Sequence, residues 1–167
     1  LRFGDQGLSA YREREGFQLI AGDIRDISKV TDCIEGAEGA ILLASLVGEP
    51  ACDLDPKETV DINLIATKAV AEAARYYEIP RFIFASTDSA YGIQEGTMLE
   101  DSPLNPISLY SRLKMQAEQE ILGLQRGSFQ PTILRMATIY GLSPRMRFDL
   151  IINILTMHAV SSGKISI

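Results

Sequence analysis

The chain has 167 residues, of which 46% are hydrophobic and 23% charged, and its formal net charge at pH 7 is -6. This composition is typical of a globular protein with one well-buried core. The negative charge argues against non-specific nucleic-acid binding, because such binding rests on Lys and Arg contacts to phosphates. The longest apolar run, 150–160, is much shorter than the roughly 20 residues of a membrane-spanning helix, so we expect no membrane partner.

The few cysteines and the single histidine limit the metal and redox chemistry of the chain. Cys33 and Cys52 show neither the spacing of a metal site nor a disulfide framework. A lone histidine, His158, also argues against metal catalysis. No signal-peptide pattern is present. We therefore expect a cytoplasmic protein with two reduced thiols and no metal site.

In the first half of the chain, short apolar runs alternate with longer amphipathic ones. The pattern predicts a strand at 17–20, a short helix at 27–34 and a buried strand at 39–44. A longer helix is expected to begin at Asp55-Pro56, because Asp is a favoured N-cap and Pro is favoured at the first helical position. This helix must end before Pro80.

The second half of the chain continues the alternation. It predicts a strand at 81–85, a strand at 131–135 and a last helix at 148–160. Between the strands, a helix is expected to begin at Asn105-Pro106 and to stop at Gly127. The polar segment 92–103 is expected to be a loop over the site. Residues 1–4 look like a loop, and residues 164–167 look like the beginning of a strand.

Strands and helices in this order predict an α/β fold, a doubly wound parallel sheet of the Rossmann type with helices on both faces. Such a sheet binds its ligands outside the carboxyl ends of its strands. No G-x-G-x-x-G pattern occurs in the chain. A site at the carboxyl edge is therefore expected, without a glycine-rich phosphate loop.

Tyr110, Lys114 and Thr87 are the residues most suggestive of chemistry. Tyr110 and Lys114 are four apart in the expected helix and so lie on one face. An ammonium beside a phenol favours the phenolate, and such a phenol can exchange protons with a hydroxyl or carbonyl near neutral pH. Thr87 follows the apolar run 81–85, where a buried strand ends, and Ser86 is the competing hydroxyl. The three residues predict redox chemistry at a carbon that bears oxygen.

Six segments, in order and with consistent spacing, resemble motifs of one enzyme superfamily. They are Gly22–Asp26, Leu42–Ser45, Asn63, Ala85–Gly92, Tyr110–Lys114 and Leu134–Gly141. Together they resemble the extended short-chain dehydrogenase/reductase superfamily, and most closely its NAD-dependent nucleotide-sugar epimerase/dehydratase family. The resemblance covers nearly the whole chain.

The resemblance implies a role for each matching residue. Tyr110 would be the catalytic acid and base, with Lys114 beside it and Thr87 bonded to the reacting sugar oxygen. Asp23 would hold the adenine amino group, and Asn63 would be structural first and catalytic second. The implied cofactor-binding residues are Asp23, Ile24, Leu43, Ala44, Ser45, Asn63, Ala85, Tyr110, Lys114 and Ala137. The implied substrate-binding residues are Thr87, Asp88 and Thr138.

The chain also departs from the family pattern at two positions. Asp88 resembles the acid of sugar 4,6-dehydratases, but the next residue is Ser89 where those enzymes have Glu. Thr138 stands where many epimerases have a substrate-binding Asn. Both departures leave the choice among epimerase, dehydratase and 4-ketoreductase open.

Three further charged residues have alternative interpretations. Glu118, one turn past Lys114, could pair with that lysine or form a helix-surface ion pair of small value. Arg145 and Arg147 precede the last helix and could meet a diphosphate or face solvent.

The resemblance implies an NAD-dependent enzyme, with NADP possible, that acts on a nucleotide-activated sugar by hydride transfer and forms a homodimer. The alternatives are a reductase of a non-sugar carbonyl and a non-catalytic dinucleotide-binding regulator. On this interpretation, residues 1–167 are a partial NAD(P)-binding domain that lacks its first βα unit. The substrate-binding region would begin at about 142–167, and most of that lobe would be absent.

Overall fold

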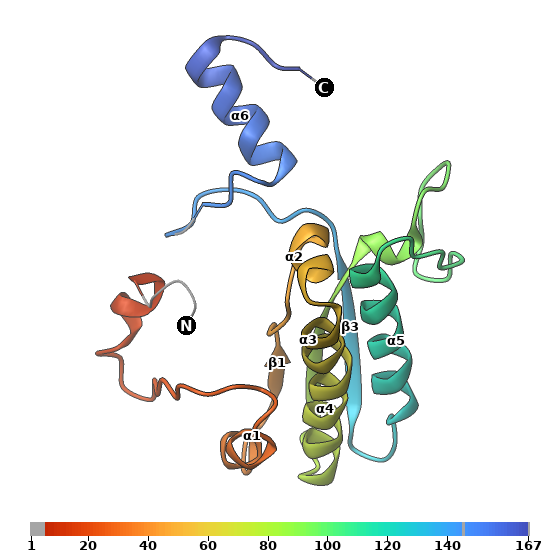
Figure 1. Ribbon diagram of the computed structural model, residues 1–167. Coiled ribbons are helices and arrows are strands. Elements are labelled where there is room, and N and C mark those ends of the chain that lie inside the picture. The colour runs from red at the N-terminus through yellow and green to blue at the C-terminus, as the bar shows by residue number, and fades with distance from the viewer. Residues whose placement is uncertain (1–5, 145, 167) are drawn as a thin grey trace. The chain divides into compact units, whose positions relative to one another are not determined.

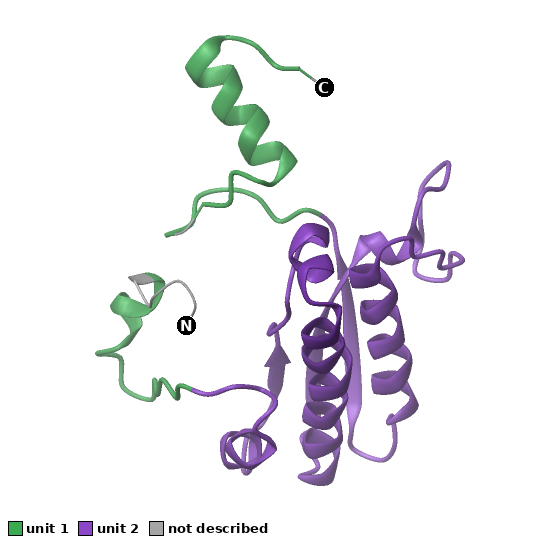
Figure 2. Cartoon of the chain, viewed as in Figure 1, with its two compact units in different colours: residues 1–21, 138–167 green, residues 22–137 purple. Residues whose placement is uncertain are grey.

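The computed structural model describes residues 6–144 and 146–166 (Figure 1). The chain divides into a sheet unit, residues 22–137, and a terminal unit, residues 1–21 and 138–167 (Figure 2). In chain order the sheet unit contains α1 (Ile27–Ile34), β1 (Ala40–Leu42), α2 (Glu49–Leu54), α3 (Pro56–Val60), the π-helical turn η2 (Asp61–Ala66), α4 (Thr67–Tyr76), β2 (Arg81–Thr87), the 3-10 turn η3 (Asp88–Tyr91), α5 (Leu109–Gly123) and β3 (Gln130–Met136). The terminal unit contains the 3-10 helix η1 (Gln6–Tyr11) and α6 (Ile151–Ser162).

The strands form a parallel sheet in the order β1-β2-β3. Phe84 of β2 is in register with Leu42 of β1 and with Ile133 of β3. Because the strands run in the same direction, their carboxyl ends meet at one edge, where ligands bind in such folds. The predicted parallel sheet of the Rossmann type is confirmed.

The helices of the sheet unit pack on one face of the sheet. Side chains alternate between the faces of a strand, and Phe82 and Phe84 on the helix side are 0% exposed. On the opposite side, Ile41 and Leu134 are 65% and 44% exposed. The prediction of helices on both faces therefore holds for one face within this unit. The strand predicted at 39–44 is shorter in the structure, where β1 spans Ala40–Leu42. It is also not buried throughout, since Ile41 is exposed.

The helix predicted from Asp55-Pro56 is confirmed, and it is interrupted by the π-helical turn η2. The Asp55 carboxylate accepts from the Glu58 backbone N–H at 2.9 Å, so it caps α3. The helix resumes as α4 and ends at Tyr76, before Pro80. Its apolar side packs into the core through Val70, Ala71 and Ala74.

Helix α5 lies inside the bounds predicted for it. It begins at Leu109 rather than after Asn105-Pro106, because Ser108 and Ser111 form a capping box in which each side chain bonds the other's backbone N–H. It ends at Gly123, and Gly127 lies beyond it in a turn with φ 59°. The helix is therefore shorter than predicted at both ends.

The sequence pattern does not predict the short helices α2, η1 and η3. The terminal unit also differs from the predicted elements at three places. Residues 17–20 form no strand and belong to the terminal unit, whereas the described strands lie in the sheet unit. The last helix begins three residues later than predicted, at Ile151, and ends at Ser162. Residues 164–166 form no strand, whereas Ile167 and the predicted loop at 1–4 lie outside the described residues. None of the described helices is long and apolar enough to cross a membrane.

Candidate active site

Thr87 lies at the carboxyl end of β2, as predicted, and it also begins the next turn. Its Oγ1 accepts from the backbone N–H of Ser89 at 3.2 Å, which caps η3. The same hydroxyl donates to Asp88 Oδ1 at 3.4 Å. Thr87 is 7% exposed and Asp88 is exposed. The strand end thus presents a fixed hydroxyl and a solvent-facing carboxylate.

Tyr110 and Lys114 lie one turn apart near the start of α5, which packs against β2. Tyr110 is half-buried, and Lys114 is 3% exposed. The Lys114 Nζ lies 4.1 Å from the centroid of the Phe84 ring, within the range of a cation–π interaction. Burial lowers the pKa of Lys114 to about 8, although the Glu118 carboxylate opposes this shift. The ammonium is therefore held on the sheet side of the helix.

Asn63 fixes the loop that follows β1. Its Oδ1 accepts from the Leu46 backbone N–H at 2.8 Å and from Ser45 Oγ at 2.9 Å. Its Nδ2 donates to the Leu46 carbonyl at 2.9 Å. Asn63 is 1% exposed within the π-helical turn, so all its polar contacts serve this loop. These bonds give Asn63 a structural role in the loop, and Leu43 and Ala44 of the same loop remain exposed.

Asp23 sits in an exposed ion-pair cluster. Its carboxylate accepts from the Arg25 backbone N–H at 2.9 Å and from Arg25 Nη2 at 2.6 Å. The side-chain hydrogen bonds from Arg25 hold the pKa of Asp23 at about 2. Arg25 Nη1 also donates to Glu58 at 3.3 Å, which ties this loop to α3. Ile24, between the two charged residues, packs against the core.

Of the two interpretations of Glu118, a pair with Lys114 or a helix-surface ion pair, the second is wrong because the side chain is buried. It is 1% exposed, and its salt bridge is with Arg135 of β3, at 2.8 Å between Arg135 Nη2 and Glu118 Oε2. Ser86 Oγ also donates to this carboxylate. Sequence reasoning missed Arg135. The available signal was a pair of charges at otherwise apolar positions, since Glu118 follows the buried Ala117 and precedes the buried Ile121 on α5.

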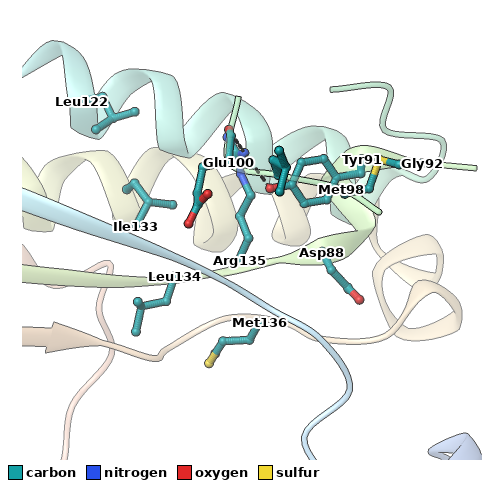
Figure 3. Close-up of a pocket in the computed structure, with 11 residues that line it drawn as sticks. Asp88, Tyr91, Gly92, Met98, Glu100, Leu122, Ile133, Leu134, Arg135 and Met136 are labelled. Atoms are coloured by element: carbon teal, nitrogen blue, oxygen red, sulfur yellow. Dashed lines mark hydrogen bonds between the residues drawn. The ribbon is translucent and has the colours of Figure 1, made fainter. Parts of the chain in front are cut away.

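A pocket lies along β3 next to the turn that follows Thr87. Figure 3 shows that Arg135 extends to the opposite side of the strand from Leu134 and Met136, toward Glu100 and Tyr91. The polar segment predicted as a loop contributes to the wall. The lining residues are Asp88, Tyr91, Gly92, Met98, Leu99, Glu100, Leu122, Ile133, Leu134, Arg135 and Met136.

The other residues singled out by the sequence lie in or just after the strands and in the terminal unit. Ala85 is buried within β2, and Ala137 follows the end of β3. Thr138 belongs to the terminal unit. There, Arg147 pairs with Asp149 at 2.5 Å, and Arg145 lies outside the described residues. Among the residues that the structure describes, no group of three or more His, Cys, Asp or Glu could hold a metal ion.

Comparison with known proteins places these features in a family. Residues 4–164 match the model of the NAD dependent epimerase/dehydratase family. A UDP-glucose 4-epimerase of Rhizobium leguminosarum bv. trifolii is 31% identical over 127 residues, which are 72% of this chain and 38% of that protein. A dTDP-glucose 4,6-dehydratase of Streptomyces niveus is 26% identical over 136 residues, 80% of this chain and 40% of that protein.

A solved structure supports the same assignment. The UDP-glucuronic acid 4-epimerase of Bacillus cereus, in complex with UDP-glucuronic acid and NAD, matches with a TM-score of 0.80 and 26% identity, over 92% of this chain and 48% of that one. The chain spans less than half the length of these relatives. Since the family model covers nearly all of it, the chain belongs to the NAD-dependent epimerase/dehydratase family.

Proposed function

We propose that this chain forms part of an enzyme that uses NAD for hydride transfer at a carbon of a nucleotide-activated sugar. The observation that carries the proposal is the arrangement of three residues in the sheet unit. Tyr110 and Lys114 lie at the start of α5, which packs against β2, and Thr87 is the last residue of β2. The similarity to epimerases and dehydratases of UDP- and dTDP-sugars supports a nucleotide-sugar substrate.

Each of the three residues has a separate role in the proposed reaction. Bound NAD supplies the hydride acceptor. The phenolate of Tyr110 receives the proton of the sugar hydroxyl as that carbon is oxidised to a carbonyl, and the resulting phenol returns the proton on reduction. The Thr87 hydroxyl bonds the same sugar oxygen, and the buried Lys114 ammonium favours the phenolate form of Tyr110.

The residues around the carboxyl edge fit a dinucleotide. The loop after β1 is held by Asn63 and leaves Leu43 and Ala44 exposed at the carboxyl end of the strand. This is the edge where parallel α/β sheets bind nucleotides. In this proposal Asp23 keeps an ionised, exposed carboxylate for the adenine amino group. The other contacts to NAD would come from Ile24, Ser45, Ala85 and Ala137.

Asp88 and Thr138 are proposed to contact the sugar. Asp88 is exposed, lines the pocket beside β3 and accepts from Thr87. The resemblance to sugar 4,6-dehydratases suggests an acid role in water elimination for Asp88, but its neighbour Ser89 cannot supply the second carboxylate. The product identifies the reaction. An epimer indicates an epimerase, a 4-keto-6-deoxy sugar indicates a dehydratase, and a reduced sugar indicates a 4-ketoreductase.

We also propose that the enzyme is a cytoplasmic homodimer that pairs through η2, α4 and α5. Ile65 of η2 is 57% exposed, which supports an apolar contact with a second copy. Cys33 and Cys52 are free thiols, which suits a reducing compartment. An Ile65→Glu variant that stays dimeric in light scattering would exclude this contact.

Product analysis tests the proposed function. The full-length protein is incubated with UDP-glucose, UDP-glucuronic acid or dTDP-glucose, and the products are identified by NMR. We expect conversion of at least one sugar and a loss of about 10²–10⁴-fold in rate in Tyr110→Phe, the usual value of a positioned acid or base. The matched control is Tyr76→Phe, since Tyr76 is 79% exposed on α4. Turnover that survives in Tyr110→Phe would remove Tyr110 from the mechanism.

A further inference from the structure

Arg135 bonds to two parts of the molecule at once. On one side its Nε and Nη2 donate to the Glu118 carboxylate at 3.0 and 2.8 Å. On the other side its Nη1 donates to Tyr91 Oη at 3.1 Å and to the carbonyl of Glu100 at 3.0 Å (Figure 3). The guanidinium carbon also lies 5.1 Å from the centroid of the Tyr91 ring. One side chain of β3 therefore joins α5, η3 and the loop 92–103.

The half of this arrangement that faces α5 is buried and joined by several hydrogen bonds. Glu118 is 1% exposed and accepts from both Arg135 and Ser86. A bidentate guanidinium–carboxylate pair fixes the plane of both groups. Because Glu118 lies on the helix of Tyr110 and Lys114, the orientation of Arg135 is set by the same helix that carries the proposed catalytic pair.

The loop 92–103 is otherwise tied mainly to itself and its flanks. Gln94 Nε2 donates to the carbonyls of Tyr91 and Pro103, and Leu99 N donates to Ser102 Oγ. These bonds shape the loop but join it to no strand. The bond from Arg135 to the Glu100 carbonyl joins the loop to β3 across 35 residues of sequence. The same loop lines the pocket through Met98 and Leu99.

We propose that Arg135 is a positioning residue that uses its pair with Glu118 to hold the loop 92–103 at the substrate side of the site and thereby sets the affinity for the sugar. Its role in substrate affinity rests on the proposed function. Lysine cannot replace arginine here, because a single ammonium lacks the planar fork that serves the carboxylate and the loop together.

The test compares Arg135→Lys with the wild type in the full-length protein with NAD. Amide hydrogen exchange of residues 92–103 is expected to rise about tenfold, the equilibrium effect of losing one charge-assisted hydrogen bond. KM for the nucleotide sugar is expected to rise by a similar factor while kcat changes less than twofold. The matched control is Arg112→Lys, at an exposed arginine of α5 that donates to the Ile107 carbonyl. This variant should change neither the amide exchange of residues 92–103 nor KM.

Tyr91→Phe is the second variant, since it removes one acceptor and leaves the Glu118 pair intact. It should raise exchange in the loop by a smaller factor and keep the wild-type unfolding midpoint. Unchanged exchange in both variants would overturn the proposal, as would a drop in kcat at constant KM. Because exchange needs no substrate, faster loop exchange in a protein that converts no sugar would contradict the proposed function and leave the loop contact established.

Discussion

The sheet unit contains two guanidinium–carboxylate clusters that look alike in distance and differ in burial. In the first, Arg25 Nη2 lies 2.6 Å from Asp23 Oδ2, and the two side chains are 42% and 49% exposed. In the second, Arg135 Nη2 lies 2.8 Å from Glu118 Oε2, and the side chains are 20% and 2% exposed. Water and salt screen the first pair, whereas the second pair interacts in a region of low polarity.

This difference assigns the two clusters different tasks. Exposed ion pairs add little to stability, so Asp23 is available to a ligand without cost to the fold. Removing one partner of a buried pair leaves an uncompensated charge, so Glu118 and Arg135 must be kept together. The first cluster is suited to recognition, and the second is suited to holding α5, β3 and the loop 92–103 in one arrangement.

The largest expected effect comes from breaking the buried cluster. Glu118→Ala should lower the free energy of unfolding by about 3–5 kcal/mol, because Arg135 loses its carboxylate. Urea unfolding at pH 7 measures the loss. Glu58→Ala in the exposed cluster is the matched control and should leave the unfolding midpoint unchanged. Equal losses in the two variants would show that burial does not separate the clusters.

The next effect concerns Lys114, a buried cation one turn before Glu118. Its pKa of about 8 lies below the ordinary value of 10.5, so the unfolded chain holds the proton more tightly. Burial of this charge therefore lowers stability below pH 8, and the penalty fades as pH rises to 10.5. Lys114→Met should stabilise the protein by about 3 kcal/mol at pH 7, because methionine fills the same site without burying a charge.

Urea unfolding of the Lys114→Met variant and the wild type at pH 7 and pH 10.5 checks this sign. The advantage of the variant should shrink between these two values, because at pH 10.5 Lys114 is neutral in the folded protein and half protonated in the unfolded chain. Lys57→Met, at an exposed position in α3, is the control. A stabilisation that does not depend on pH would mean that packing, rather than charge, distinguishes the variant.

The smallest effect on stability is expected in the exposed cluster. Asp23→Asn should leave the unfolding midpoint unchanged and weaken NAD binding about tenfold, the scale of one hydrogen bond to a charged group. Since Arg25 holds the pKa of Asp23 at about 2, the binding difference should stay constant from pH 5 to pH 8. Fluorescence titration with NADH measures it, beside Glu58→Gln as control. NADH affinity equal to that of the wild type would remove Asp23 from the cofactor site.

Local signals in the sequence predicted much of the fold. The Asp55-Pro56 cap, the parallel strands and the strand-end position of Thr87 follow from neighbouring residues, and the structure confirms them. The start of α5 was misplaced because Ser108 and Ser111 form a better cap than Asn105-Pro106. Residues 17–20 have strand character but form no strand, because a local sequence pattern does not supply the backbone partner that a strand needs.

The site was predictable where one element carries it. Tyr110 and Lys114 share a helix, so their spacing predicts their common face. Arg135 and Glu118 are 17 residues apart on different elements, so no spacing rule brings them together. The burial of Glu118 depends on the packing of α5 against the sheet, which the sequence pattern of a single helix does not contain.

Hydride transfer is tested most directly by the absorbance at 340 nm of full-length protein loaded with NAD and mixed with a nucleotide sugar. We predict a sugar-dependent rise in absorbance as hydride leaves the sugar, and its loss in the Tyr110→Phe variant. Bound NAD with no change in absorbance or product for any UDP- or dTDP-sugar would contradict hydride transfer at a sugar carbon. That result would favour a non-sugar substrate or a regulatory role.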